Sequence, residues 1–212
     1  FELFSVTPKD VRLEYLKKLR TITVNRFDEL AEAISTEMGA PITMAKEAQA
    51  DAAIGHLDGF INALESMKET EKLDNGDILT REPIGVCGLI TPWNWPINQI
   101  TLKVLPALAT GCTCILKPSE HTPLSAIIYA EMIDEAGYPP GVFNLINGDG
   151  PTVGSELSKH PDIQMMSFTG STRAGICVTK DSADTVKRVT LELGGKSPNL
   201  VFSDCDLEER VN

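Results

Sequence analysis

Residues 86–116 read VCGLITPWNWPINQITLKVLPALATGCTCIL, and this stretch decides the fold. Residues 86–90 form a short apolar run of the kind that makes a buried strand. Residues 97–109 are apolar at helical spacing, and Gly111 follows them as a helix stop signal. Residues 112–116 are a second apolar run of strand length. A strand, a helix and another strand in this order predict two parallel strands joined by a right-handed crossover.

The same alternation continues as far as residue 193. It comprises predicted strands at residues 142–146, 163–168 and 186–193, and predicted helices at residues 122–137, 151–158 and about 171–181. The sequence therefore predicts an α/β fold, a Rossmann-like parallel sheet with helices on both faces. Because ligands of such sheets bind at the carboxyl ends of the strands, the residues directly after each strand are the candidates for function.

The first seventy residues read as helices that need a sheet to cover. Thr7 and Pro8 form an N-cap and first-turn pair, and apolar residues recur after them at helical spacing. A second helical run ends at Gly39. A third, from about residue 42 to residue 68, is rich in alanine and charged helix formers, although two glycines weaken its middle.

Residues 74–82 change in character from the helices before them. Residues 74–77 are Asp-Asn-Gly-Asp, which predicts a turn, and residues 78–82 predict an extended segment. This segment is either a short strand in an arm that reaches a partner subunit, or a simple connecting loop.

Composition excludes several classes of partner. The 212 residues are 42% hydrophobic, which is enough for one good core, and 30 acidic against 19 basic residues give a net charge of −11. This charge argues against nucleic acid and anionic membrane as partners. No apolar run is long enough to span a bilayer and no leader opens the sequence, so we expect a soluble, cytoplasmic protein. The chain begins without methionine and stops within a helix-like run, so both ends look cut.

The cysteines and histidines predict neither disulfides nor a metal site. The five cysteines are an odd number, and none is spaced as C-x-x-C, so reduced thiols are expected. The three histidines lie far apart in the sequence, and none shares a helical face with a second type of ligand. We therefore predict no metal.

The first predicted strand is followed by a rigid loop, Thr91-Pro92-Trp93-Asn94-Trp95-Pro96, that holds one amide side chain. Two tryptophans and two prolines restrict Asn94, and a fixed amide N–H is what an oxyanion requires. The alternative is that Asn94 caps the helix that follows.

Two further strands are followed by candidate nucleotide ligands. Lys117-Pro118-Ser119-Glu120 supplies a cation and a carboxylate where a Rossmann-like sheet reads a ribose. Residues 169–175 are small and open a helix, whose free N–H groups and positive end can hold a pyrophosphate. They do not form G-x-G-x-x-G, so a capped helix start without a ligand is the alternative.

The last predicted strand ends in a carboxylate next to a double-glycine turn, in the stretch Leu191-Glu192-Leu193-Gly194-Gly195. The glycines let a ligand approach the backbone beside Glu192. Glu192 is thus a candidate general base, and a solvated surface carboxylate is the alternative.

Four motifs in this order and roughly this spacing resemble those of the NAD(P)-dependent aldehyde dehydrogenase superfamily: PWNWP at 92–96, LKPSE at 116–120, FTGST at 168–172 and LELGGK at 191–196. The resemblance implies a cofactor-binding domain made of residues 1–74 and 89–195. It implies an oligomerisation arm at residues 75–88, which would build a homodimer or homotetramer. Residues 196–212, with a strand at 198–202, would begin a catalytic domain that is truncated here.

The resemblance also implies a mechanism and a set of site residues. In the similar enzymes a cysteine attacks an aldehyde, an asparagine amide holds the oxyanion, NAD(P) accepts a hydride, and a glutamate helps water hydrolyse the thioester to a carboxylic acid. Asn94 and Glu192 match the asparagine and the glutamate, whereas the cysteine is expected beyond Asn212. The implied cofactor contacts are Ile90, Thr91, Pro92, Trp93, Lys117, Ser119, Glu120, Gly150, Gly154, Phe168, Gly170, Ser171, Ala174 and Leu193.

NAD is the expected cofactor, with NADP possible, because Glu120 can accept hydrogen bonds from ribose hydroxyls and would repel a 2′-phosphate. Two alternatives stay open. One is a nucleotide-binding fragment without catalytic activity, and the other is a CoA-acylating aldehyde dehydrogenase, whose relatives generally lack the glutamate. The sequence does not identify the aldehyde.

Overall fold

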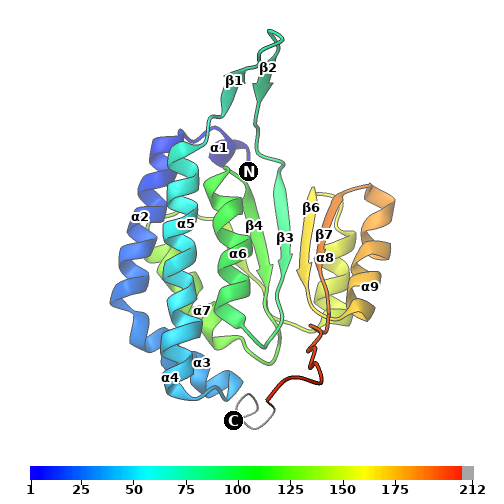
Figure 1. The fold of residues 1–212 in the computed structure, drawn as a ribbon. Coiled ribbons are helices and arrows are strands. Elements are labelled where there is room, and N and C mark those ends of the chain that lie inside the picture. Colours follow the sequence, from blue (N-terminus) through cyan, green and yellow to red (C-terminus); the bar gives the residue numbers. More distant parts are fainter. Residues whose placement is uncertain (207–212) are drawn as a thin grey trace.

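The computed structural model describes residues 1–206, and its centre is a five-stranded parallel sheet (Figure 1). The strands lie in the order β5-β4-β3-β6-β7, and every neighbouring pair is parallel. Their bounds are β3 (Val86–Ile90), β4 (Thr113–Lys117), β5 (Phe143–Leu145), β6 (Met165–Thr169) and β7 (Arg188–Glu192). The predicted Rossmann-like sheet is confirmed, and the strand ends differ from the predicted ones by at most two residues.

The strand order reverses between β3 and β6. The chain runs outward from β3 through β4 to β5, then returns to place β6 against the other side of β3 and continues to β7. Such a reversal separates the loops at the carboxyl ends of the two central strands and opens a crevice between them. The reversal point of the strand order, where such sheets bind their ligands, therefore follows Ile90 and Thr169.

Helices cover both faces of the sheet, as predicted (Figure 1). On one face α6 (Pro96–Ala109) and α7 (Leu124–Glu135) lie against the strands, and α2 (Lys9–Asn25), α3 (Phe27–Met38) and α5 (Asp51–Ser66) pack outside them. On the other face lie α8 (Ser155–Lys159) and α9 (Thr172–Ser182). The larger apolar core fills the first face and a smaller one, with Met166 and Phe168, fills the second.

Several helix boundaries differ from the predicted ones. The helix predicted from Thr7-Pro8 begins at Lys9, and no side chain caps it. The long helix predicted at 42–68 is a continuous run of α4 (Ile42–Met44), the π-helical η1 (Ala45–Ala50) and α5. A short α1 (Glu2–Ser5) and a 3₁₀ turn, η3 (Ala183–Thr185), have no counterpart in the prediction. No helix within residues 1–206 is long and apolar enough to cross a membrane.

Residues 70–80 form a hairpin that stands away from the body (Figure 1). β1 (Thr70–Lys72) and β2 (Ile78–Thr80) pair antiparallel around the predicted turn. The connecting-loop interpretation is therefore wrong. The hairpin begins at residue 70, ahead of the predicted arm at 75–88, and residues 86–88 belong to β3, while the role of the arm stays a prediction. β1 was not predicted since it is polar and has no apolar alternation.

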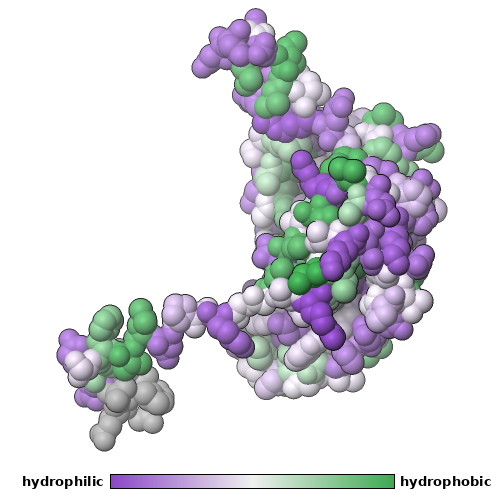
Figure 2. Space-filling view, turned by 90° about the vertical axis from the view of Figure 1, so that its right-hand side faces the viewer, coloured by the Kyte–Doolittle hydropathy of each residue, from purple (hydrophilic) through white to green (hydrophobic). Residues whose placement is uncertain are grey.

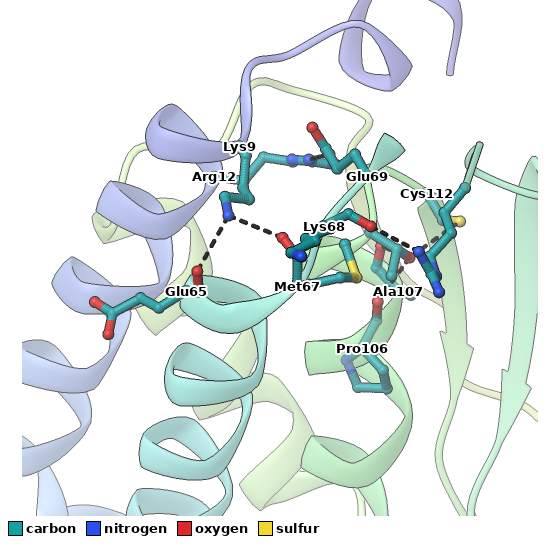
Figure 3. A network of polar contacts seen from close by, with 11 residues as sticks. Lys9, Arg12, Glu65, Met67, Lys68, Glu69, Pro106, Ala107 and Cys112 are labelled. Atoms are coloured by element: carbon teal, nitrogen blue, oxygen red, sulfur yellow. Dashed lines mark hydrogen bonds and ion pairs between the residues drawn. The ribbon is translucent and has the colours of Figure 1, made fainter. Parts of the chain in front are cut away.

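Two basic side chains from α2, Lys9 and Arg12, hold the base of the hairpin (Figure 3), and Arg81, which follows β2, is a third. Lys9 Nζ donates to the carbonyls of Glu65 and Met67, at 3.2 and 3.0 Å. The Arg12 guanidinium, only 3% exposed, forms an ion pair with Glu69. Arg81 Nη1 donates to the Lys68 carbonyl at 2.8 Å. These contacts satisfy carbonyls at the end of α5 and fix the direction in which the hairpin leaves it.

The segment after β7 has no regular secondary structure between residues 193 and 206. The strand predicted at 198–202 is absent, and Leu200 and Phe202 are 76% and 71% exposed. A strand requires a partner, and the described part of the chain offers none to this segment, which extends away from the body (Figure 2). Residues 207–212 of the predicted catalytic-domain segment lie outside the described residues.

Candidate functional site

Two buried hydroxyls lie at the carboxyl ends of the central strands. Thr91, 3% exposed, follows β3, and Thr169 ends β6. Neither side-chain oxygen has a hydrogen-bond partner among residues 1–206, although both are buried. Both hydroxyls lie at the edge of the sheet where parallel α/β folds bind their ligands, so they are candidate ligand contacts. Ile90, 8% exposed, closes the apolar floor beside them.

The end of β4 supplies the predicted cation and carboxylate. Lys117 is 2% exposed, and its Nζ donates to the Pro118 carbonyl at 2.8 Å and lies 3.6 Å from Glu120 Oε2. Burial lowers the pKa of Lys117, and the Glu120 carboxylate opposes this shift. Ser119 is buried, whereas Glu120 remains 49% exposed. The ammonium is therefore held in place while the carboxylate faces the opening.

The helix predicted at 151–158 begins as a π-helical turn, η2 (Gly150–Gly154), and continues as α8. Asp149 caps this turn by accepting from the Thr152 N–H at 2.7 Å. Gly150 is exposed and Gly154 is buried. A Cβ at Gly154 would lie 3.7 Å from Ile90 and 3.8 Å from the Lys117 side chain. The turn after β5 thus lies against the ends of β3 and β4.

The start of α9 combines a capped helix with close backbone approach. Ser171 Oγ accepts from the Ala174 N–H at 3.2 Å, so its side chain is the N-cap. A Cβ at Gly170 would lie 2.6 Å from the Phe168 ring, which is why a glycine is required there. Leu193 packs on the same helix, since a Cβ at Gly175 would lie 2.6 Å from its side chain. The Ser171 hydroxyl therefore caps α9, as the alternative interpretation expects. The backbone N–H groups of this turn remain the candidate anion site.

Asn94 and Glu192 lie at the same edge of the sheet. Trp95, not Asn94, precedes the first residue of α6, and no side chain caps that helix, so the capping alternative for Asn94 is wrong. The exposed Asn94 has no hydrogen bond within the described residues, and Trp93 beside it is 53% exposed. Glu192, also exposed, ends β7 opposite Thr169, and its carbonyl accepts from the Gly170 N–H at 3.0 Å. Both side chains are free to meet a ligand.

One further residue, Lys103, was not predicted from the sequence. It lies on α6, is 8% exposed, and its Nζ donates to Ser167 Oγ in β6 at 2.8 Å. Burial lowers the pKa of Lys103 to about 8, and the carboxylate of Glu192 acts in the opposite direction. The sequence could have pointed to Lys103 by its position three residues after Ile100, on the apolar face of the helix.

Comparison with known proteins gives the family. Residues 1–212 match the sequence profile of the Aldehyde dehydrogenase family. The chain belongs to this family. It is 53% identical to a 3-succinoylsemialdehyde-pyridine dehydrogenase of Pseudomonas sp over 212 residues, which are 100% of this chain and 44% of that protein.

Two solved aldehyde dehydrogenases have closely similar folds. The enzyme from Bartonella henselae has a TM-score of 0.94 at 52% identity, covering 98% of this chain and 44% of that one. A mutant of Aldehyde Dehydrogenase C from Pseudomonas syringae, solved with NAD+ and octanal, has a TM-score of 0.93 at 50% identity, covering 98% and 43%. The chain thus spans less than half the length of these relatives and corresponds to their amino-terminal part.

The three buried cysteines of this aldehyde dehydrogenase segment lie away from Glu192. Cys87 and Cys114 are register partners, and Cys112 directly precedes β4, so these buried cysteines lie toward the amino ends of the strands. Hydrogen bonding to Cys87, Thr110 and nearby backbone groups lowers the pKa of Cys112. Cys112 lies at the opposite edge of the sheet from Asn94, so it is not placed to act with that amide. No group of residues that could hold a metal occurs within residues 1–206.

A cavity of about 830 Å³ lies at that amino edge of the dehydrogenase fold. The first residues of several strands line it, among them Val86, Thr113 and Val142, together with Phe4. Its position at the far end of the strands separates it from the predicted cofactor contacts.

Proposed function

We propose that this chain is the cofactor-binding part of an NAD-dependent aldehyde dehydrogenase that oxidises an aldehyde to a carboxylic acid. The observation that carries the proposal is the set of groups at one edge of the sheet. The unpaired hydroxyls of Thr91 and Thr169 lie in the crevice, and Asn94 and Glu192 lie beside it, both exposed and free of internal hydrogen bonds through their side chains. The family relationship supports assigning this edge to a dinucleotide and an aldehyde.

The residues at the crevice fit a dinucleotide. The exposed carboxylate of Glu120 would accept from ribose hydroxyls, and the turn at Gly170 would bring backbone N–H groups to a pyrophosphate. The two orphan threonine hydroxyls would gain partners. When bound, NAD supplies the acceptor for a hydride.

The chain's own polar groups would act on the other reactants. The Asn94 amide would donate an N–H to the oxygen of the aldehyde as negative charge develops there. Glu192 would accept a proton from the water that hydrolyses the thioester. The cysteine that forms this thioester is expected outside residues 1–212, so we expect the chain alone to bind dinucleotide without dehydrogenase activity.

The test of this function is Glu192→Gln in the full-length protein. We expect a burst of NADH followed by a slow steady state, because acylation survives while hydrolysis loses its base. Asn94→Ala is the companion variant and is expected to reduce the burst itself. Loss of the burst in Glu192→Gln would contradict the role of base.

NAD is the proposed cofactor in preference to NADP. Lys117 is buried and donates to the Pro118 carbonyl, which supports a fixed cation that does not swing out to neutralise a 2′-phosphate. Glu120 is half exposed, so solvent reduces its repulsion of that phosphate to about 1 kcal/mol, or roughly fivefold in preference.

The measurement for this choice is kcat/KM with both cofactors for the full-length wild type, Glu120→Gln and Glu156→Gln. The third protein loses an equal charge from an exposed position on α8. We expect the NAD preference to fall in Glu120→Gln alone. An unchanged ratio in that variant would exclude Glu120 as the discriminator.

The hairpin supports a proposal about assembly and not about chemistry. Ile78 is 70% exposed and Leu79 is 37% exposed on an arm that stands off the body. Exposed apolar residues on such an arm suit pairing with a second copy, so we propose a homodimer or homotetramer. The five unbridged cysteines suit a reducing compartment, and a cytoplasmic location stays a prediction.

A further inference from the structure

Glu37 is a half-buried carboxylate near the end of α3 that contacts a different helix, α7. It accepts hydrogen bonds from the Leu124 N–H, from the Ser125 N–H at 3.2 Å and from the Ser125 hydroxyl. Leu124 and Ser125 are the first two residues of α7, and the N-cap residue of that helix, Pro123, supplies no side-chain hydrogen bond. Glu37 therefore acts as a cap from another helix and satisfies free N–H groups at the start of α7.

The position of Glu37 is unfavourable for a carboxylate considered by itself. Burial raises the pKa of Glu37, and the hydrogen bonds from Ser125 and Leu124 act in the opposite direction. Glu37 also lies in the last turn of α3, where the negative end of the helix dipole disfavours a negative charge. The donors of α7 oppose both effects, so the contact with α7 is the structural contribution of this carboxylate.

The start of α7 is also the end of the loop that carries Glu120. This loop, residues 118–123, joins β4 to α7. Its first end is fixed to the sheet, because Lys117 is buried and its carbonyl accepts from the Thr91 N–H at 3.2 Å. Its second end is held by Glu37. The exposed carboxylate of Glu120 thus lies between two fixed points of the backbone.

We propose that Glu37 is a positioning residue for the nucleotide: by holding the start of α7, it fixes the loop in the conformation that presents Glu120 to a ribose. The proposal rests on the proposed role of Glu120 and adds a residue that acts from α3, through the backbone of the loop. A loop side chain that is already ordered loses less freedom when a ligand binds, which is worth about twofold to tenfold in affinity. Removal of the cap should therefore weaken nucleotide binding without altering the groups that react.

Glu37→Gln in the full-length protein is the variant that tests the proposal. The amide keeps one oxygen that can accept from α7 and replaces the other acceptor by an NH₂ group, so an N–H at the start of α7 loses its partner while the fold is retained. Glu32→Gln is the matched control, because Glu32 lies exposed on the same helix and loses an equal charge. Glu120→Gln and the double variant Glu37→Gln/Glu120→Gln complete a double-mutant cycle.

Three measurements are made on each of these proteins. The first is hydrogen–deuterium exchange of the peptides that span residues 118–126, without nucleotide. The second is calorimetric titration with NAD and with the NAD analogue that lacks the adenosine 2′-hydroxyl. The ratio of the two Kd values reports the contact between Glu120 and the ribose, which a general loss of stability does not change. The third is kcat with saturating NAD.

In Glu37→Gln we expect faster exchange at residues 118–126 and a Kd for NAD that is about twofold to tenfold higher. The preference for NAD over the analogue should shrink, and kcat should not fall. Glu32→Gln should resemble the wild type. In the cycle, Glu37→Gln should raise the Kd less when Glu120 is already replaced.

The opposite results separate the steps of the inference. Unchanged exchange in Glu37→Gln would overturn the anchoring of the loop. Faster exchange with an unchanged Kd, or with additive effects in the cycle, would overturn the link to the nucleotide. A wild type that binds no dinucleotide would refute the proposed function, and the exchange result would still decide whether Glu37 fixes the loop.

Discussion

Gly111 and Gly137 offer a controlled test of how the base of the hairpin is held. Both follow the end of a helix, α6 or α7, and their φ angles are +84° and +85°. A Cβ at Gly137 would meet nothing within 4 Å, whereas a Cβ at Gly111 would lie 2.8 Å from Arg12 Nη1 and 3.1 Å from Pro83. Alanine at the two positions therefore introduces the same backbone strain, and at Gly111 alone it also displaces the buried guanidinium.

The expected magnitudes follow from this difference. An L-residue in the left-handed region costs about 1 kcal/mol of stability, which is the whole effect expected for Gly137→Ala. Removing a partner from a fully buried ion pair costs about 3–5 kcal/mol. Glu69 is 43% exposed, so solvent reduces this penalty and we add about 1–2 kcal/mol. Gly111→Ala should then destabilise the protein by about 2–3 kcal/mol.

The assay is urea unfolding followed by far-ultraviolet circular dichroism for the wild type and both alanine variants. A double-mutant cycle adds Arg12→Met and Gly111→Ala/Arg12→Met. We expect the effects of Gly111→Ala and Arg12→Met to be less than additive, because either change alone disrupts the Arg12–Glu69 pair. Equal losses for Gly111→Ala and Gly137→Ala, or full additivity in the cycle, would refute the reasoning.

Two other predictions concern charged residues. Glu69→Gln removes the carboxylate that pairs with the buried Arg12, so limited proteolysis within residues 70–80 should become faster. Glu65→Gln is the control. It breaks an ion pair with Lys17 in which both side chains are about half exposed, so the rate of proteolysis should change little. Burial lowers the pKa of Lys103 from 10.5 to about 8, so between pH 8 and pH 10 the unfolded chain binds more protons than the folded one and stability rises with pH. The wild type should gain about 1–2 kcal/mol relative to Lys103→Met between pH 7.5 and 9.5 in urea unfolding, and parallel pH dependences would show that Lys103 is not buried as described.

The sheet was predictable because its strands are short apolar runs separated by capped helices. Residues 86–116 contain a complete strand, helix and strand unit, and the structure has β3, α6 and β4 there. The failures occurred where long-range partners decide the conformation. β1 is polar and is a strand because β2 pairs with it, and residues 198–202 are apolar and form no strand without a partner.

The site was predictable only in part. The motif residues come directly after strands, and a parallel sheet brings such residues to one edge whatever their spacing in the chain. Lys103 lies within a helix, and the groups that act on its amine, Ser167 and Glu192, come from two strands far away in the sequence. Its altered ionisation is a property of burial and packing, which a single sequence does not display. The low pKa of Cys112 likewise depends on Cys87, which lies on the neighbouring strand.

The isolation of the hairpin has a consequence for how sequences of this kind can diverge. β1 and β2 pair with each other, and the arm is joined to the body at its base by Lys9, Arg12 and Arg81. Substitutions at the tip of the arm therefore leave the sheet, the crevice and both cores untouched. Residues 70–80 form a separable module, so natural selection or an engineer can exchange its exposed surface while the sheet and the helices that cover it stay constant.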